Sequence, residues 1–218
     1  MFQFVSLGGD CQPAAQIRKR RPSSVAHFFD WIGIPIRQTI ELIRNDFEGF
    51  FDRENLHPHY AGDGFYGIVE MRYRADVQHG VPSFDIATTE AIRELFVMRA
   101  RWLREMLEED NDPVYFIRSW TVRDGPENEA DAIELFELLR SKRRDIRLLY
   151  LHNDPGREDR ISGGYRSAYL RQASSPYVWS GDDRAWLSLL EDFAVRPGGD
   201  DKGASPLPAP RRPRFMSA

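Results

Sequence analysis

Residues 2–20 read FQFVSLGGDCQPAAQIRKR, and the predicted fold is built outward from this stretch. A short apolar run ends in Gly8 and Gly9, and Asp10 and Cys11 follow before a segment with helical periodicity. This order is typical of a buried strand, a tight turn and a helix that begins at the turn. The turn would place Cys11 at the mouth of a sheet, beside the backbone N–H groups of a helix N-terminus. Because a helix N-terminus attracts negative charge, this position favours a thiolate.

The rest of the chain alternates between apolar runs of strand length and longer segments with helical periodicity. Strands separated by helices of about ten or more residues imply parallel pairing with right-handed crossovers. We therefore predict an α/β fold, a three-layer domain with a mostly parallel central sheet flanked by helices. The predicted strands are 2–7, 65–72, 114–117 and 146–151, with a further short strand at 177–179, and the predicted helices are 13–20, 36–47, 88–109, 124–141 and 182–193. Polar and breaker residues predict irregular structure in segments 49–64, 73–84 and 155–164.

The expected domain covers residues 1–195 as a single unit. The segment 196–218, RPGGDDKGASPLPAPRRPRFMSA, is rich in proline, glycine and charge. Such a composition cannot bury enough apolar surface to offset the entropy of ordering, so we predict that this tail is disordered.

Composition limits the classes of partner. The chain has 30 Lys and Arg against 34 Asp and Glu, a net charge of −4, which does not favour nucleic-acid binding. No apolar run approaches the roughly 20 residues that cross a bilayer, and no signal peptide is evident. The single cysteine excludes an intramolecular disulfide and fits a reducing compartment. We expect a cytoplasmic protein without a membrane span, whose oligomeric state stays open.

Three predicted strands end in residues that can do chemistry. Ligands bind beyond the carboxyl ends of the strands in open α/β sheets, and Cys11, Arg118 and His152 follow strands at that edge. Cys11 could act as a nucleophile, with backbone amides near Gly9 and Gln12 as oxyanion donors. A small buried apolar role for the cysteine is the alternative.

Asp10 also has two possible roles. It belongs to the turn Gly8–Asp10, which could bind an oxyanion or a ligand, or it could simply be the N-cap of the helix. Its negative charge would raise the pKa of the neighbouring thiol. Asp30, between two aromatic residues, could orient a histidine or cap a backbone turn. Arg118 could hold a carboxylate or phosphate, or pair with Asp30 or another buried acid.

Two of the five histidines are candidate bases. His79 stands in a predicted loop, and His152 ends a predicted strand. His27 lies in an aromatic run and is expected to be packed. His57 and His59 would face solvent; they resemble half of a metal site whose other ligands are missing. The glycine pair lacks the continuation of a P-loop or of GxGxxG, and neither HExxH nor CxxC occurs, so we expect no metal and no cofactor.

Several short motifs together carry a family resemblance: Ser6–Cys11 with Ala14, Ile17 and Arg18, then Phe29–Trp31, Asn45–Phe47, Arg99–Leu103 and Tyr115–Arg118. Through these motifs the chain resembles the bacterial family of putative papain-like cysteine peptidases over about its first 150 residues. The resemblance implies a cysteine nucleophile, carried here by Cys11, and a histidine whose nearest match is His79. This sequence departs from the family pattern in having residues 80–83 between His79 and the Phe84-Asp85 pair.

The leading hypothesis is a cysteine hydrolase or acyl transferase. Cys11 would attack an amide, ester or thioester of a peptide or small molecule, His79 or else His152 would move protons, and Arg118 would position an anionic group. The rival hypothesis is a transferase or binding protein for an anionic sugar or phosphate-bearing ligand. There Gly8, Gly9 and Arg118 would bind the anion, and Cys11 would only pack.

Overall fold

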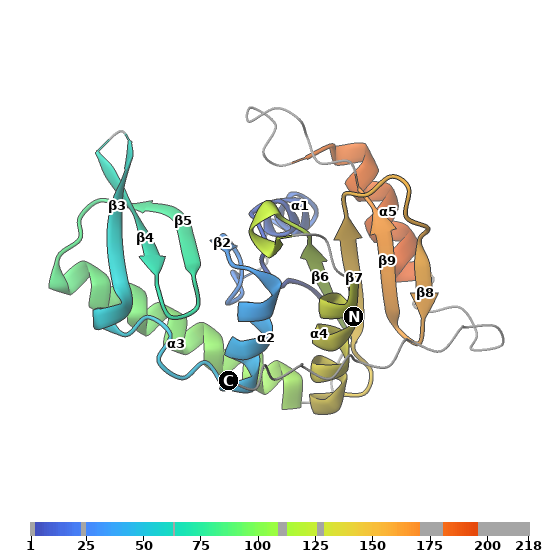
Figure 1. The fold of residues 1–218 in the computed structure, drawn as a ribbon, viewed down its shortest axis with the longest axis horizontal. Coiled ribbons are helices and arrows are strands. Elements are labelled where there is room, and N and C mark those ends of the chain that lie inside the picture. Colours follow the sequence, from blue (N-terminus) through green and yellow to red (C-terminus); the bar gives the residue numbers. More distant parts are fainter. Residues whose placement is uncertain are drawn as a thin grey trace, which may run out of the picture.

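The computed structural model describes residues 3–22, 25–62, 64–108, 113–125, 129–170 and 181–195, with the backbone alone for Ala61, Gln78, His79 and Val195. It contains two β-sheets (Figure 1). The larger, sheet A, has the order β1-β6-β7-β9-β8, in which the first four strands are parallel and β8 is antiparallel at the edge. Its strands are β1 (Gln3–Ser6), β6 (Val114–Ser119), β7 (Arg147–His152), β9 (Tyr165–Tyr169) and β8 (Arg160–Ser162).

The smaller, sheet B, is antiparallel throughout and has the order β2-β5-β4-β3. Its strands are β2 (Ile32–Gly33), β5 (Ala75–Val81), β4 (Phe65–Glu70) and β3 (Leu56–Gly62). The α-helices are α1 (Gln12–Arg20), α2 (Ile36–Arg44), α3 (Ile86–Glu108), α4 (Glu129–Lys142) and α5 (Asp183–Val195), with 3₁₀ turns η1 (Arg53–Asn55) and η2 (Val122–Asp124). Sheet B stands beside sheet A with α2 between them, and α3 runs from sheet B towards α4 (Figure 1). None of the described helices combines the length and the apolar character that a membrane span needs.

Alternating side chains bury both faces of sheet A, as a parallel sheet requires. Phe4, Tyr115 and Leu149 point into one cluster with residues of α1 and α5. Val5 and Phe116, one residue further along their strands, point into a second cluster with α4 that continues through α2 and α3 into sheet B. The two sheets therefore share one continuous core on this side.

The end of α2 shows how α3 is attached to the rest of the domain. The backbone N–H of Phe47 donates to Leu42 O at 2.9 Å, and that of Asp46 donates to Ile43 O at 3.4 Å, which is the Schellman pattern of a helix C-terminus. Asp46 takes the left-handed position that glycine usually fills, with φ +50°. Arg104 of α3 explains why aspartate rather than glycine stands here, because its guanidinium donates to Asp46 Oδ1 at 2.6 Å and to Asp46 O at 2.7 Å.

The α/β class and a mostly parallel sheet are confirmed for sheet A, whereas the antiparallel sheet B was not predicted. Three segments predicted to be irregular contain β3, β5 and β8, so those predictions were wrong, and β9 was missed. β3 is an edge strand, where Pro58 and exposed polar side chains are tolerated, so it lacks an apolar strand pattern. A three-layer arrangement of the whole domain stays a prediction. The predicted strand at 177–179 and the predicted disordered tail at 196–218 lie outside the described residues.

Replacing Asp46 tests the helix cap. Asp46→Ala keeps the left-handed backbone and loses the ion pair, whereas Asp46→Gly loses the same ion pair and relieves the backbone. We expect urea denaturation to show Asp46→Gly more stable than Asp46→Ala by about 1 kcal/mol. Equal stabilities would mean that residue 46 is not held in the left-handed conformation.

Candidate functional site

The turn between β1 and α1 is built on two glycines that lie against β6. Leu7 N–H donates to Ile117 O at 2.8 Å and extends the pairing of β1 with β6. The chain then turns with φ +74° at Gly8 and +94° at Gly9. A Cβ on Gly9 would collide with the carbonyl oxygen of Ser119, at the end of β6. Both backbone conformation and space therefore require glycine at position 9.

Asp10 precedes Cys11, which is the N-cap of α1, so the expected N-cap role of Asp10 was wrong by one residue, and its side chain ties the turn to β6. Its Oδ1 accepts hydrogen bonds from the Gln12 N–H at 2.9 Å and from the Ser119 hydroxyl at 3.0 Å. Burial raises the pKa of Asp10 above its usual range, and these two hydrogen bonds partly oppose the rise. Because the Gln12 amide donates to Asp10, it can reach a substrate oxyanion only by giving up that bond. The oxyanion role of Gly9 and Gln12 stays a prediction.

Cys11 precedes α1, where its carbonyl accepts the Ala15 N–H at 3.0 Å, and its side chain is half-buried. Burial, the larger cause, and the carboxylates of Asp10, Asp76 and Asp30 together raise the pKa of the thiol to about 12. The helix N-terminus by itself would favour a thiolate and lower the pKa. Burial and the three carboxylates outweigh this effect. At neutral pH the resting thiol is protonated. Asp76 lies in β5 and Asp30 just before β2, so these two charges act on the thiol from sheet B and the segment that enters it.

Asp30 caps the turn that leads into β2, which is one of its two expected roles. Its Oδ2 accepts the His27 N–H at 3.0 Å, and it lies 3.7 Å from the Arg18 guanidinium. Burial raises the pKa of Asp30 to about 6, although the hydrogen bond and Arg18 act in the opposite direction. Trp31 follows with φ +67°, a strained backbone for a bulky residue, under the guanidinium of Arg18 at 5.0 Å.

Arg118 is fully buried at the end of β6, and its terminal nitrogens bond within the protein. Nη1 donates to Leu7 O at 3.2 Å, and Nη2 donates to Ile34 O at 2.9 Å and to Asp124 Oδ1 at 2.6 Å. The ion pair with a buried acid, foreseen as an alternative, is present, but its acid is Asp124 and not Asp30. The sequence placed Asp124 only at the start of the predicted helix 124–141. In the structure it belongs instead to the 3₁₀ turn η2, where its Oδ2 accepts the Thr121 N–H at 2.8 Å. A role of Arg118 in holding an anionic group stays a prediction.

His152 ends β7, and β6 lies between β7 and β1. Neighbouring strands are about 4.8 Å apart, so the axes of β1 and β7 are separated by roughly 10 Å. The His152 side chain is buried, with Nε2 3.8 Å from Asp159 Oδ1, and neither ring nitrogen has a hydrogen-bond partner among the described residues. His152 therefore lies on a different strand end from Cys11, and its role as a base stays a prediction.

His79 lies on β5, and its side chain is outside the part of the chain that the structure describes. Val77 pairs with Ile32, the first residue of β2. Two residues further along β5, at about 3.3 Å per residue, the backbone of His79 lies beyond that end of β2, on the side from which Asp30 and Trp31 enter.

The remaining histidines are less suited to act as bases. Burial, the larger cause, and the charges of Arg18 and Arg99 together lower the pKa of His27 to about 4. Its Nε2 lies 3.0 Å from the Gln3 amide nitrogen. His57 and His59 are exposed on β3, as expected. Among the residues that the structure describes, no three His, Cys, Asp or Glu side chains gather as a metal site.

One comparison with known proteins gives a match. A family model described as "Putative papain-like cysteine peptidase" matches residues 2–151. The chain belongs to this family. The match covers β1 to β7 and so contains the turn with Cys11, Asp30, β5 and the Arg118–Asp124 pair. No curated protein and no solved structure matches the chain.

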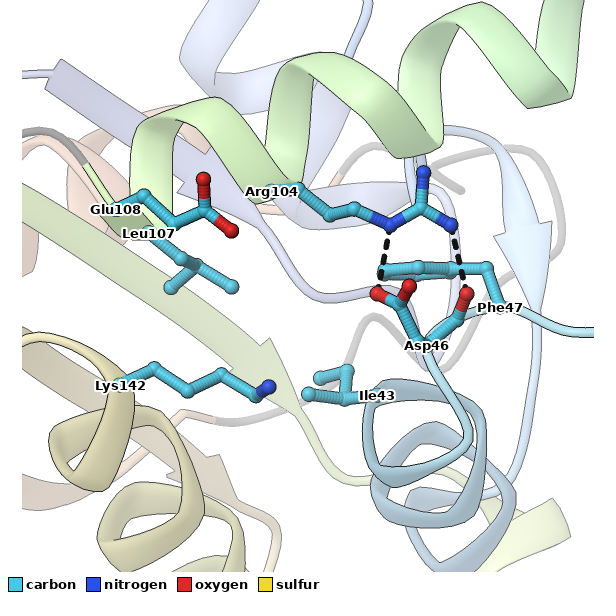
Figure 2. A pocket seen from close by; sticks show the side chains of 7 residues that line it. All are labelled: Ile43, Asp46, Phe47, Arg104, Leu107, Glu108 and Lys142. Atoms are coloured by element: carbon cyan, nitrogen blue, oxygen red, sulfur yellow. Dashed lines mark hydrogen bonds and ion pairs between the residues drawn. The ribbon is translucent and has the colours of Figure 1, made fainter.

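A cavity of about 220 Å³ lies where α2, α3 and α4 end, apart from the turn that carries Cys11 (Figure 2). Its floor is Ile43, Phe47 and Leu107, and its rim carries the Asp46–Arg104 pair together with Glu108 and Lys142. The Schellman cap of α2 accounts for Asp46 and Phe47, so they are part of the helix connection. The cavity contains none of the predicted site residues.

Substituting the glycine turn separates close contact from backbone strain. Gly9→Ala meets both the Ser119 carbonyl and a positive φ, whereas Gly64→Ala, in the β3–β4 turn, has φ +80° and nothing within 4 Å of the added Cβ. We expect Gly64→Ala to cost about 1 kcal/mol and Gly9→Ala at least about 2 kcal/mol more in urea denaturation. Similar losses in the two variants would show that the turn has room to move away from β6.

Proposed function

We propose that this protein is a cysteine hydrolase or acyl transferase in which Cys11 is the nucleophile. One observation supports this proposal above all. The chain belongs to the papain-like family, and its single cysteine lies half-exposed beyond the carboxyl end of β1, directly before α1. Peptides and small molecules with an amide, ester or thioester carbonyl are the proposed substrates. The proposed place of action is the cytoplasm.

The reaction begins from a protonated thiol. A base removes the proton of Cys11 Sγ as the sulfur attacks the carbonyl carbon, and the carbonyl electrons move to oxygen. Backbone amides near Gly9 are proposed to hold that oxyanion. When the oxyanion collapses, the bond to the leaving group breaks, and the base returns its proton to the departing amine, alcohol or thiol. Water or a second acceptor then takes the acyl group from Cys11 by the same steps.

His79 is the proposed base, with Asp30 as the residue that orients it. This assignment is supported by the register of β5 against β2, which brings the backbone of His79 towards the turn of Asp30. Asp30 is also near enough to Cys11 for its charge to raise the pKa of the thiol. A carboxylate beside an imidazole fixes the tautomer and stabilises the imidazolium that forms during attack. His152 is the second choice, because β6 separates its strand from β1.

The nucleophile is tested by Cys11→Ala in assays with peptide, ester and thioester substrates. We expect turnover to fall by a factor of about 10³ or more, while the free energy of unfolding changes by less than about 1 kcal/mol. Mass spectrometry of the wild type should show an acyl adduct on residue 11. His79→Gln should lose turnover and His57→Gln, an exposed histidine of β3, should not. Full turnover by Cys11→Ala would refute the proposal.

Asp30→Asn separates the catalytic use of Asp30 from its effect on stability. Since burial raises its pKa from 3.8 to about 6, the folded protein holds the proton more tightly, and stability falls as pH rises from about 4 to 6. Asp30→Asn keeps an oxygen for the His27 N–H and avoids a buried charge. It should be more stable than wild type at pH 8, by about 3 kcal/mol at most, with the difference vanishing near pH 4.

The opposite slope that comes from His27 is common to both proteins and cancels in this difference. Turnover should fall in Asp30→Asn, because the amide cannot stabilise an imidazolium as a carboxylate does. Urea midpoints at pH 4.5 and pH 8, with kcat measured on the same samples, check both outcomes. Unchanged turnover would remove Asp30 from the mechanism.

A second function is favoured by one observation, the high pKa of Cys11, which suits a thiol that only packs. The protein would then be a transferase or binding protein for an anionic sugar or phosphate-bearing ligand. Phosphate or a nucleotide sugar should raise the melting temperature, and alkylation of Cys11 should leave that shift unchanged. The carboxylates around Cys11 and the internal bonding of Arg118 oppose an anion there, which is why this function is second.

A further inference from the structure

Asp124 is the acid on which the geometry of the cysteine turn depends. We infer that Asp124 is a positioning residue which, through Arg118, fixes the turn that carries Cys11 and thereby sets how accessible and reactive the thiol is. This inference rests on the proposed function for its catalytic consequence. Its structural part, the control of the thiol, stands by itself.

The Asp124 carboxylate joins three parts of the chain. Oδ1 accepts hydrogen bonds from Arg118 at 2.6 Å and from the Ile36 N–H, the first residue of α2, also at 2.6 Å. Oδ2 accepts the Thr121 N–H at 2.8 Å. The side chains of Arg118 and Asp124 are 0% and 4% exposed, so water does not compete for these bonds.

Arg118 carries this constraint to the cysteine turn. Its Nη1 donates to Leu7 O, the last carbonyl before the glycines, and its guanidinium lies close to both of them. A Cβ on Gly9 would lie 3.2 Å from both Cζ and Nη1 of Arg118, and a Cβ on Gly8 would lie 3.6 Å from Nη1. The guanidinium is thus a wall of the turn that ends in Cys11.

The neighbouring residue of β6 holds the other side of the same turn. The Ser119 hydroxyl donates to Asp10, and Asp10 directly precedes Cys11. Arg118 and Ser119 therefore hold the segment from Leu7 to Asp10 in one conformation. They can do so only as long as the guanidinium of Arg118 keeps its orientation. Asp124 sets that orientation, because it binds Nη2 while it is itself held by two backbone N–H groups. A guanidinium without this partner would be a buried unpaired charge and would move.

The single cysteine makes the inference testable without a known substrate. Alkylation by iodoacetamide, which is uncharged, reports on Cys11 alone in the intact protein. We compare Asp124→Asn with Asp192→Asn, which breaks the Arg166–Asp192 pair between β9 and α5, of the same 2.6 Å length. At pH 8, Asp124→Asn should raise the alkylation rate constant at least ten-fold, because a loosened turn exposes the thiol and lowers its pKa. Asp192→Asn should change it less than two-fold.

Global unfolding also exposes a cysteine. The alkylation rate constants are therefore measured at several urea concentrations at which both variants remain folded, and they are extrapolated to zero urea. Arg118→Lys is the second variant. It keeps the positive charge, but one ammonium cannot replace the planar fork that reaches Leu7 O, Ile34 O and Asp124, so the rate should rise here too. Equal rates in Asp124→Asn and Asp192→Asn would overturn the inference. The inference would also be overturned if Asp124→Asn and Arg118→Lys both failed to fold while Asp192→Asn folded, because the Arg118–Asp124 pair would then serve the fold alone.

The experiment also separates this inference from the proposed function. If Asp124→Asn and Arg118→Lys are alkylated faster and lose turnover while Asp192→Asn keeps its turnover, both the inference and the proposed function are supported. If the same alkylation pattern appears but Cys11→Ala is fully active in the wild-type background, the positioning role holds and the cysteine chemistry is wrong. If turnover depends on Cys11 but alkylation is unaffected by Asp124→Asn, the cysteine chemistry holds and the positioning role is wrong.

Discussion

The buried ion pair of Arg118 and Asp124 is the constraint on which the two-sheet arrangement depends. Removing a guanidinium and a carboxylate from water costs several kcal/mol for each ion, which only close and well-paired contacts offset. The partners here are Leu7 O after β1, Ile34 O after β2, and the N–H groups of Ile36 and Thr121. Because the pair is satisfied only when these segments are together, sheet A, the end of β2 and the start of α2 meet at one point. The turn that carries Cys11 lies at that same point, so the fold and the candidate site share one constraint.

The sequence predicted those parts of the fold that local patterns determine. The apolar run before Gly8 and the helical period after Cys11 gave β1 and α1, and comparable patterns gave β4, β6, β7 and the long helix α3. β9 was missed because Arg166 interrupts it, and that arginine is accommodated by Asp192 from α5, a partner that the strand itself does not reveal. β5 was missed because Asp76, Gln78 and His79 give it a polar sequence. In both strands a charged side chain is paired with a residue distant in sequence, Arg166 with Asp192 and Asp76 with Arg123.

The same limit applies to the site. The position of Cys11 at a helix start was correctly derived, but the helix N-terminus predicts a low thiol pKa and the structure gives a high one. Asp10 is adjacent in sequence, so its opposing effect was foreseeable. Asp76 lies 65 residues away along the chain and reaches the thiol only because β5 pairs with β2. Arg118 was likewise recognised as a buried cation in need of a partner, yet the choice of Asp124 over Asp30 required the course of the chain after β6. Local sequence identifies the reactive group, whereas tertiary pairing sets the sign of the field around it.

A high thiol pKa does not by itself make Cys11 inert. Carboxylates several ångströms away raise the pKa of a thiol because they repel the thiolate, and they raise the pKa of a neighbouring imidazole because they attract the imidazolium. Transfer of a proton from sulfur to a nitrogen within hydrogen-bond reach moves charge over only a few ångströms, so the free energy of transfer depends on the difference between these two effects. Asp30 and Asp76 come from the side of sheet B, which also carries His79. Carboxylates nearer to the base than to the sulfur favour the imidazolium more than they penalise the thiolate, and the acidic surroundings of Cys11 then assist the proton transfer that attack requires.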